Sequence, residues 1–452
     1  MNIEQEKIEK FLKDLYPIMR SLTGNGNRKT LNYIKDNYIP DSIIKSIKSG
    51  TKIFDWEVPD EWNIDEAYIK NIYGKKIIDL KDNNLHIVSY SKSIDTKLEP
   101  KELIKKLHTL PNHPNWIPYR TTYYKKDWGF CCKDSLLKSK DFKGPFTVKI
   151  DSDFNPKGRL DWLECYHQGQ SKNEILISTY FCHPNLANDN LSGLVAAVKL
   201  FEFISQIKTK FSYRLIIVPE TIGAISFLSQ ANISRLVGGM VISCVAGPGK
   251  LSIKEGFDNK HWINKAAIYA LEKITKGDYI RYPFTPDGSD ERQYSSPGIR
   301  IVTPSIHKSK YYEYPEYHTS ADDLNFISST NLLDTLEVYK QWIINIESYC
   351  KPKRIEEKCE LQLGKRGLYP SIGGTLGQVA NNLVNNDLIY KENNFKNNTN
   401  IKDKYINAYR WIMHLADGTN SNFEICEKSN IDLDIINNCI SIFAENKLVF
   451  IK

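Results

Sequence analysis

The chain has 452 residues, of which 41% are hydrophobic and 25% are charged, and its formal net charge is +7. This length predicts two or three globular domains, and lysines spread along the chain predict a solvated surface rather than a nucleic-acid-binding stripe. The acid-containing N-terminal segment is not typical of a signal peptide, and no apolar run approaches the roughly 20 residues of a membrane-spanning helix, so we expect neither feature. Since its nine cysteines are also scattered, we expect a cytoplasmic protein with reduced thiols and no membrane association.

The first half of the chain changes character twice. Residues 3–38 carry apolar side chains at helical spacing, with a break at Thr23-Gly24-Asn25-Gly26-Asn27. Residues 51–149 are rich in aromatic side chains and short alternating runs, which predicts a mostly β module inserted into the main domain. Residues 150–352 alternate strands and helices, so we predict an α/β domain, formed by residues 1–50 and 150–352, with a mixed, largely parallel sheet flanked by helices.

The elements of this sheet domain are predicted from apolar runs and helical periodicity. The expected strands are Ile175–Phe181, Tyr213–Pro219, Val237–Val245 and Ile299–Pro304. The expected helices are Ser192–Ile207, Gly223–Gln230, Lys260–Thr275 and Ser329–Ser348.

Residues 353–452 form a third predicted unit. Three short helices and a terminal strand are typical of a winged-helix module. The last of these helices, Leu433–Glu445, contains no Lys or Arg. Because a helix that reads a DNA groove is expected to be basic, we expect this module to mediate protein contacts or homodimer formation, and we do not expect nucleic acid as a partner.

A histidine and an aspartate flank the first predicted crossover of the sheet. His183 follows the strand Ile175–Phe181, and Asp189 precedes the helix Ser192–Ile207. Imidazole and carboxylate are ligand types that zinc accepts, and open α/β sheets keep their sites at this edge. The alternative is a strand-capping histidine with an Asp/Asn turn before a helix.

Two further strand ends carry candidate residues. Glu220 follows the strand Tyr213–Pro219, where its carboxylate can act as the base that takes a proton from water; the alternative is an acid favoured by the helix dipole. Cys244 ends the next strand and is either a soft metal ligand or an inert buried thiol.

Polar loops complete the candidate set. Asp290 and Arg292 lie in the loop 288–294, which is either a substrate-recognition loop or a solvated charge cluster. His318, with Tyr317 beside it, lies in a Tyr- and acid-rich loop and would supply another ligand from the same sheet edge. Within the inserted module, Tyr119 and Arg120 are candidates for binding an acidic or sugar-like group, since arginine binds carboxylate and phosphate in a two-pronged way; the alternative is an aromatic core with a surface arginine.

Taken in order, these motifs resemble the zinc-dependent aminopeptidase family that includes bacterial leucyl aminopeptidases, glutamate carboxypeptidase and glutaminyl cyclase. Over nearly its whole length, the chain resembles an uncharacterised bacterial group of aminopeptidase-like proteins. The motifs of that second resemblance are Arg20-Ser21-Leu22-Thr23-Gly24, residues 117–124, residues 128–131, Cys182-His183-Pro184, Asn188-Asp189-Asn190, residues 288–294 and residues 314–320.

The resemblance to the peptidases implies an aminopeptidase fold with two zinc ions that share one carboxylate. By position, Asp189 would be the shared ligand. His183 would hold one ion and His318 the other, while Glu220 would be the general base. The substrate would be a small peptide or another small molecule that contains an amide.

The chain departs from the peptidase pattern at three positions. Thr221 stands where the peptidases have a second, metal-binding acid, Cys244 stands where they have an aspartate ligand, and Asn185 stands where an acid orients the first histidine. A catalytic zinc commonly keeps three protein ligands and a water. We therefore expect one zinc ion rather than two, with His183, Asp189 and Cys244 as one ligand set.

Three functions follow from these observations. The first is a zinc-dependent hydrolase of the aminopeptidase type that cleaves an amide bond with metal-activated water and a glutamate base. The second is a binding or regulatory protein on a peptidase scaffold that has lost acids needed for catalysis. The third is an amide hydrolase acting on a sugar or modified amino acid in a biosynthetic pathway.

Overall fold

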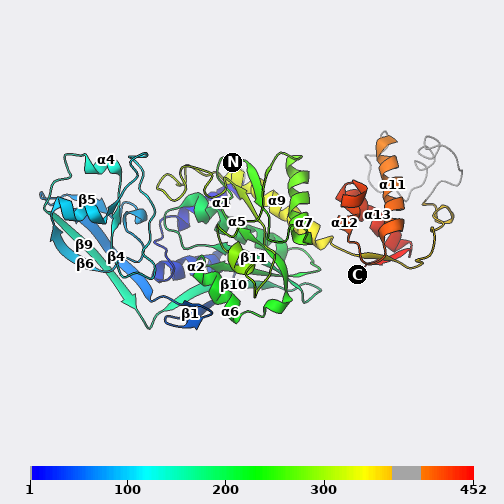
Figure 1. The fold of residues 1–452 in the computed structure, drawn as a ribbon, viewed down its shortest axis with the longest axis horizontal. Coiled ribbons are helices and arrows are strands. Elements are labelled where there is room, and N and C mark those ends of the chain that lie inside the picture. Colours follow the sequence, from blue (N-terminus) through cyan, green and yellow to red (C-terminus); the bar gives the residue numbers. More distant parts are fainter. Residues whose placement is uncertain (1–2, 369–398, 452) are drawn as a thin grey trace. The chain divides into compact units, whose positions relative to one another are not determined.

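The computed structural model describes residues 3–368 and 399–451 (Figure 1). The chain divides into two compact units, Met1–Ile343 and Ile344–Lys452, which we call the N-terminal and C-terminal units. Each is described by itself below.

An eight-stranded sheet forms the centre of the N-terminal unit. Its strand order is β1-β10-β12-β11-β13-β16-β14-β15. The β12-β11, β11-β13, β13-β16 and β14-β15 pairs are parallel, and the other three pairs are antiparallel. The predicted α/β architecture with a mixed, mostly parallel sheet is therefore confirmed. The strands are β1 (Ile43–Lys48), β10 (Arg159–His167), β11 (Glu174–Tyr180), β12 (Ser212–Val218), β13 (Leu236–Ile242), β14 (Leu251–Lys254), β15 (Ile280–Tyr282) and β16 (Ser305–Lys308).

Helices cover this sheet on both faces. The chain passes from β11 through α5 (Gly193–Ser205) to β12, and then through α6 (Ile222–Gln230) back past β11 to β13. Because crossovers between parallel strands are right-handed, these opposite directions place α5 and α6 on opposite faces, as Figure 1 shows. The chain therefore leaves β11 toward one face of the sheet and leaves β12 toward the other. In open α/β sheets, such a change of direction forms a crevice at the carboxyl ends of the two strands.

One predicted strand is displaced along the chain. We predicted Ile299–Pro304, but the strand β16 spans Ser305–Lys308. The residues just before it already run beside β13, since the backbone N–H of Gly239 donates to Val302 O and that of Val241 to Pro304 O. Pro304 has no backbone N–H and cannot donate a hydrogen bond to β13. The regular hydrogen-bond ladder between the two strands therefore begins only after Pro304.

A second, four-stranded antiparallel sheet lies between β1 and β10 in the sequence. Its order is β5-β4-β9-β6. Its strands are β4 (Glu61–Lys70), β5 (Lys76–Asp79), β6 (Ile94–Leu98) and β9 (Phe146–Asn155). Apolar side chains from this sheet, such as Ile69 and Val148, share one buried core with Trp162 and Val218 of the main sheet.

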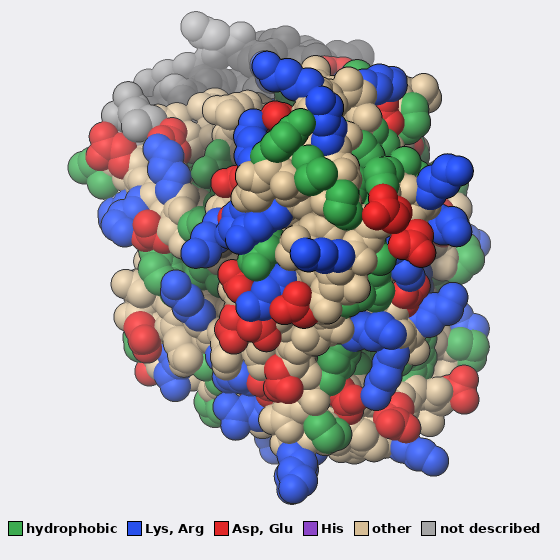
Figure 2. Space-filling model, turned by 90° about the vertical axis from the view of Figure 1, so that its left-hand side faces the viewer, with side chains coloured by type: hydrophobic (Ala, Val, Ile, Leu, Met, Phe, Trp, Pro, Cys, Tyr) green, Lys and Arg blue, Asp and Glu red, His purple; other side chains and the backbone are tan. Residues whose placement is uncertain are grey.

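Figure 2 shows the face of the molecule that lies on the side of the four-stranded sheet, where basic and acidic side chains are interspersed. Ion pairs in this part of the chain include Lys75 with Asp141 and Lys149 with Glu66. The four-stranded sheet thus carries mixed charge on its outer surface.

The remaining elements of the N-terminal unit are short, apart from four helices, the last of which ends four residues beyond Ile343. Those helices are α1 (Ile3–Leu15), α2 (Asn25–Asn37), α7 (Trp262–Thr275) and α9 (Ser329–Glu347). The short elements are β2 (Lys52–Ile53), β3 (Trp56–Glu57), α3 (Pro100–Leu103), β7 (Leu107–His108), β8 (Phe130–Cys131), α4 (Asp134–Leu137), α8 (Glu291–Tyr294) and the single-turn helices η1 (Asn84–His86), η2 (Ile104–Lys106), η3 (Ala187–Ser192) and η4 (Ile233–Arg235).

Within its described residues, the C-terminal unit contains three helices and a two-stranded antiparallel sheet. The strands are β17 (Pro352–Arg354) and β18 (Val449–Ile451), and η5 (Gly364–Arg366) follows β17. The helices are α11 (Thr399–Leu415), α12 (Asn422–Ser429) and α13 (Leu433–Glu445). Since part of residues 353–452 lies outside the described residues, the winged-helix assignment and the predicted domain boundaries stay predictions.

Two sequence-level expectations concern the environment of the chain. Among the described residues, no helix combines the length and the apolar character that crossing a membrane requires. None of the nine cysteines, all of which lie in the described part of the chain, forms a disulfide. The cytoplasmic location stays a prediction.

Candidate metal centre

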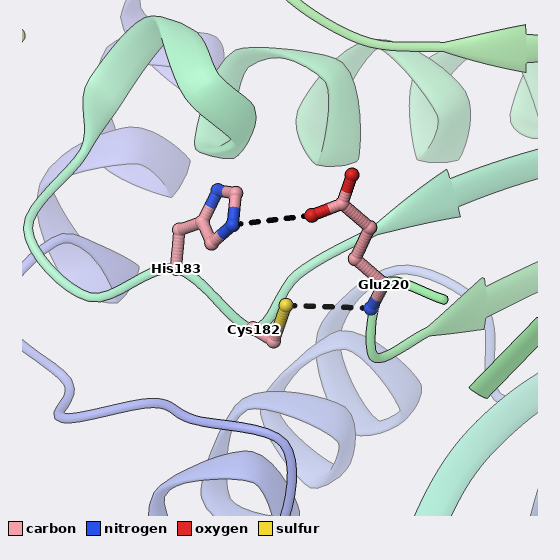
Figure 3. Close-up of side chains that lie close together, drawn as sticks. All are labelled: Cys182, His183 and Glu220. Carbon is pink, nitrogen blue, oxygen red and sulfur yellow. Dashed lines mark hydrogen bonds and ion pairs between the residues drawn. The ribbon is translucent and has the colours of Figure 1, made fainter. Parts of the chain in front are cut away.

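The first two candidate residues come from neighbouring strand ends. β11 and β12 are parallel and in register, with Tyr180 opposite Val218, so the segments that follow them leave the sheet side by side. His183 and Glu220 lie in these two segments. His183 Nε2 lies 3.4 Å from Glu220 Oε2 (Figure 3).

Asp189 lies on the other side of the His183 ring. It is held in η3, the turn that leads from the end of β11 into α5, and it is fully buried. His183 Nδ1 lies 3.3 Å from Asp189 Oδ2 and 3.2 Å from its backbone oxygen. The Tyr180 hydroxyl donates to the second carboxylate oxygen, Oδ1, at 2.5 Å.

His318 completes a cluster from a third segment. Its Nε2 lies 2.8 Å from Asp189 Oδ2, the oxygen that also faces His183. One ligand atom from each of His183, Asp189 and His318 lies within 4.8 Å of the other two. The structure therefore brings together three residues that are separated by up to 135 positions in the sequence (318 minus 183).

The chemistry of this cluster fits a zinc-like cation. Asp189 Oδ2 and His318 Nε2 are both buried and have no hydrogen-bond partner of good geometry, although they face each other. Two imidazoles and a carboxylate are a common ligand set for zinc at catalytic sites, where three protein ligands leave one position open. A cation between these atoms would satisfy both of them.

The charges of the cluster are strongly coupled. Burial acts to lower the pKa of His183, but the adjacent Asp189 carboxylate outweighs it and raises that pKa well above its usual value. Burial acts to raise the pKa of Asp189, but the nearby imidazoles of His183 and His318 outweigh burial and hold that pKa below its usual range. Without a cation, a proton on His183 supplies the positive charge that Asp189 requires, and a metal ion would replace that proton.

A hydrogen-bond network fixes the turn that carries Asp189. The Asp322 carboxylate accepts the backbone N–H of Asn188 at 2.6 Å and that of Asp189 at 3.0 Å. The Asn188 amide oxygen accepts the backbone N–H groups of Ala246 and Gly247, both at 3.0 Å. The turn is thereby tied to the loop of His318 and to the loop after β13.

Two cysteines flank the cluster in different ways. Cys182 Sγ accepts the backbone N–H of Glu220 at 3.3 Å, and one ligand atom each of Cys182, His183 and Glu220 lies within 4.8 Å of the others (Figure 3). Burial raises the pKa of the Cys182 thiol to about 11. Cys244 Sγ lies 3.8 Å from Asp189 Oδ1, the oxygen that faces away from the two histidines. The predicted role of Cys244 as a ligand stays a prediction.

The loop 288–294 contacts the segment after β12 rather than the cluster itself. Asp290 Oδ1 accepts the backbone N–H of Thr221 at 2.7 Å, and the exposed Arg292 donates to the Thr221 hydroxyl at 3.0 Å. Burial and the nearby Glu220 carboxylate raise the pKa of Asp290 well above its usual value. In this structure Asp290 lies near Glu220 and Arg292 contacts the adjacent Thr221, and the predicted role of both residues in substrate binding stays a prediction.

Aromatic rings line the histidines. The Tyr119 ring lies 5.1 Å from that of His183 and 5.2 Å from that of His318, edge to face with both. Tyr317 stacks on His318 with ring centroids 3.9 Å apart. Arg120 follows Tyr119, but its side chain is exposed and lies toward His108 and Cys131. The structure thus brings Tyr119 and Tyr317 to the cluster and does not bring Arg120 there.

Sequence reasoning missed three residues of this arrangement. Tyr180 belongs to an apolar strand, and the sequence alone predicts that a tyrosine in such a strand packs in the hydrophobic core. Asp322 lies four positions after His318 in the same acid-rich loop, so its place in the motif was a usable signal. Cys182 directly precedes His183, and the sequence distinguishes it only as part of the motif Cys182-His183-Pro184.

The comparisons with known proteins agree with this fold. A family model described as "Domain of unknown function (DUF4910)" matches residues 9–349. A protein of Clostridium acetobutylicum described as a "putative polysaccharide biosynthesis protein with aminopeptidase-like domain" is 38% identical over 431 residues, which cover 94% of this chain and 92% of that protein.

Solved structures extend the likeness. The crystal structure of a "putative peptidase" from Clostridium acetobutylicum matches with a TM-score of 0.85 and 36% identity, covering 99% of this chain and 96% of that one. A zinc aminopeptidase from Bacillus subtilis matches with a TM-score of 0.56 and 12% identity, covering 76% and 94%. The predicted resemblance to aminopeptidase-like proteins is confirmed, and at 12% identity the second match shows the fold alone.

Proposed function

Since the chain belongs to the DUF4910 family and has an aminopeptidase-like fold, we propose that it is a zinc-dependent hydrolase that cleaves an amide bond in a small peptide or another small molecule. The observation that carries this proposal is the convergence of His183 and His318 on one oxygen of Asp189, at 3.3 Å and 2.8 Å. Neither Asp189 Oδ2 nor His318 Nε2 has a hydrogen-bond partner of good geometry, although both atoms are buried. Buried polar atoms without a hydrogen bond are expected where the atoms bind a metal ion.

In this proposal, His183, Asp189 and His318 hold one zinc ion. When bound, zinc polarises a carbonyl group and lowers the pKa of water. Asp189 provides the negative charge, and Tyr180 fixes its carboxylate by donating to the oxygen that the histidines leave free. The Asp189 side chain is 0% exposed, whereas the His318 side chain is 34% exposed. The ligand cluster is therefore accessible to solvent from the side of His318.

Glu220 is the proposed general base. Its carboxylate is 23% exposed and lies 3.4 Å from His183, so it can reach both water and the ligand cluster. Glu220 would accept the proton of the attacking water and pass it to the leaving amine. Its backbone is fixed by Cys182, and the following N–H is fixed by Asp290, which limits the motion of this segment.

Two variants test the proposal. Zinc bound to the purified protein should be close to one ion per chain, and Asp189→Asn should bind zinc more weakly than the wild type, because the remaining carbonyl oxygen is a neutral and weaker donor. Glu220→Gln should retain zinc and the fold but lose activity by about 10²- to 10⁴-fold. Glu202→Gln, a partly buried glutamate on α5, is the matched control. Wild-type zinc affinity in Asp189→Asn would contradict the proposed site.

An amide on a sugar is the second candidate substrate. It is favoured by the description of the Clostridium acetobutylicum relative as a polysaccharide biosynthesis protein. Screening aminoacyl anilides beside acetylated amino sugars distinguishes it from a peptide substrate. If the protein binds zinc but cleaves neither class of substrate, the alternative function as a binding or regulatory protein is favoured. Thr221 and Cys244 also support this alternative, because they stand where the peptidases have acids.

A further inference from the structure

A thiol, an imidazole and a carboxylate meet beside the proposed zinc site. Cys182 is buried, and its Sγ lies within 4.8 Å of a ring nitrogen of His183 and of a carboxylate oxygen of Glu220. The three side chains point toward one another from the ends of β11 and β12 (Figure 3). The backbone N–H of Glu220 donates to the same sulfur, which ties the two segments together.

The two nitrogens of His183 face different groups. Nδ1 faces Asp189, at 3.3 Å from Oδ2, whereas Nε2 faces Glu220, at 3.4 Å from Oε2. The group of Cys182, His183 and Glu220 therefore lies on the side of the ring opposite to Asp189 and His318. The imidazole of His183 therefore lies between two sets of ligand atoms, one formed with Asp189 and His318 and the other with Cys182 and Glu220.

We propose that Cys182, His183 and Glu220 form a second cation position, selective for thiophilic divalent ions, whose occupation withdraws Glu220 from catalysis. The last clause rests on the proposed function, in which Glu220 is the base. The cation position itself rests only on the three side chains and their geometry.

The ligand types determine which ions bind. A cysteine sulfur is a soft donor that favours zinc, cadmium or cobalt over magnesium and calcium, which prefer oxygen. On binding, the S–H bond of Cys182 breaks, the proton passes to solvent and a sulfur–metal bond forms, with no change in oxidation state. His183 would ligate through Nε2 and keep a proton on Nδ1, which donates to Asp189 as metal-bound histidines commonly do.

The two positions compete for His183. A neutral imidazole that ligates through one nitrogen keeps its proton on the other. An ion on the Cys182 side therefore leaves only Asp189 and His318 free on the other side. Because Glu220 then serves as a ligand, it can no longer accept a proton from water.

Cys244 is the competing thiol, and the structure separates the two. Its Sγ lies 3.8 Å from Asp189 Oδ1, the oxygen already bonded to Tyr180, and on the far side of the carboxylate from the histidines. Cys182, in contrast, lies next to His183 and Glu220 at once. Cys244→Ser is therefore the matched control for Cys182→Ser, since both change one buried sulfur to oxygen.

The experiment titrates the full-length protein with Co²⁺ and Cd²⁺ and records the sulfur-to-metal charge-transfer band in the ultraviolet. The wild type and Cys244→Ser should show the band, and Cys182→Ser should lose it. Glu220→Gln should retain the thiol but bind Cd²⁺ at least about tenfold more weakly, which provides a test even if Cys182→Ser folds poorly. A band that survives in Cys182→Ser, or no band in the wild type, would overturn the proposal.

Inhibition gives a second measurement. Cd²⁺ should inhibit amide hydrolysis by the wild type, and Cys182→Ser should need at least about tenfold more Cd²⁺ for the same inhibition. Equal inhibition of both proteins would refute the proposal that a cation bound at Cys182 prevents Glu220 from acting as the base. The absorption band requires no turnover, so an inactive protein would reject the proposed function without deciding the cation position.

Discussion

At the scale of single residues, the two oxygens of Asp189 have separate partners. Oδ1 accepts the Tyr180 hydroxyl at 2.5 Å, while Oδ2 faces His183 and His318. A hydrogen bond to a charged oxygen is stronger than one between neutral groups, so Tyr180 defines the orientation of the carboxylate. That orientation leaves one oxygen aimed between the two imidazoles, which is the arrangement that cation binding needs.

A different histidine makes the stability of the fold depend on pH. His307 is buried, and its ring nitrogens lie 2.8 Å from Ser243 O and 3.0 Å from Ser305 Oγ. Burial lowers its pKa to about 3, from a usual value of about 6.5. Below pH 6.5 the unfolded chain binds a proton that the folded chain does not, so the free energy of unfolding falls as the pH falls.

The variant His307→Gln tests this pH dependence. In the wild type, His307 should contribute a slope of up to about 1.4 kcal/mol per pH unit to the free energy of unfolding between about pH 5 and pH 3.5. His307→Gln should be less stable at neutral pH but should lack this part of the slope, as measured by urea unfolding at several pH values. The exposed His113→Gln is the control. An unchanged slope in His307→Gln would show that another group causes the acid sensitivity.

At the scale of elements, the turn between β11 and α5 is held from outside. The Asp322 carboxylate accepts two successive backbone N–H groups of this turn, at 2.6 Å and 3.0 Å, and also the Tyr314 hydroxyl at 3.2 Å. Asp322 is fully buried, and burial raises its pKa to about 7. The loop that supplies His318 therefore also positions Asp189, so the two ligands are fixed by one connection.

Asp322→Asn should damage both stability and metal binding. The amide has one oxygen instead of two, and its NH₂ group would face a backbone N–H donor. We expect a loss of about 1–3 kcal/mol in the free energy of unfolding and a zinc affinity lowered by about 10- to 100-fold. The control is Asp323→Asn at the next position, where the carboxylate accepts only local N–H groups. Thermal unfolding and zinc competition measure the two effects, and wild-type zinc affinity in Asp322→Asn would refute the argument.

The same elements show what a sequence can predict. β11 and β12 were predicted within one residue at each end because they are long apolar runs buried on both faces of a parallel sheet. β16 was predicted too early because Ile299–Pro304 is also apolar and runs beside β13, and only the missing N–H of Pro304 delays the ladder. Apolar content therefore locates a strand better than it locates the first paired residue.

The candidate site was predictable where it follows strand ends and less so elsewhere. His183 and Glu220 meet because parallel neighbouring strands end at one edge. Arg120 was predicted beside Tyr119, but successive side chains of an extended segment point to opposite sides, so only Tyr119 faces the histidines. Cys182 was missed because a lone cysteine in an apolar run looks like core, and only the fold places Glu220 against it.

At the scale of the whole molecule, the region between β1 and β10 helps to build the site. The backbones of Ile117 and Tyr119 pair with the loop of His318: Tyr119 N–H donates to His318 O at 2.8 Å, and Ser320 N–H donates to Ile117 O at 2.8 Å. Tyr119 and Ile117 also pack on Leu186, close to Asp189 in sequence. This region therefore forms one wall of the ligand cluster, within the same compact unit as the main sheet.

The C-terminal unit buries one face of its last helix in its own core. On α13, Ile436, Cys439, Ile440 and Phe443 are buried, at the spacing of one helical face. The outward face carries Asn438 and other polar or acidic residues, and the helix contains no Lys or Arg. Binding to duplex DNA requires cations that neutralise phosphates, and this helix supplies none.

We therefore expect no salt-dependent binding of duplex DNA by the full-length protein. Fluorescence anisotropy with a labelled duplex, measured across a range of salt concentrations, provides the test. Asn438→Lys combined with Glu445→Lys is the positive control, because both positions are exposed on α13 and each new cation should steepen the salt dependence by about one phosphate contact. If the wild type already binds with a steep salt slope, then basic residues outside α13 contact DNA, and the expectation based on this helix is wrong.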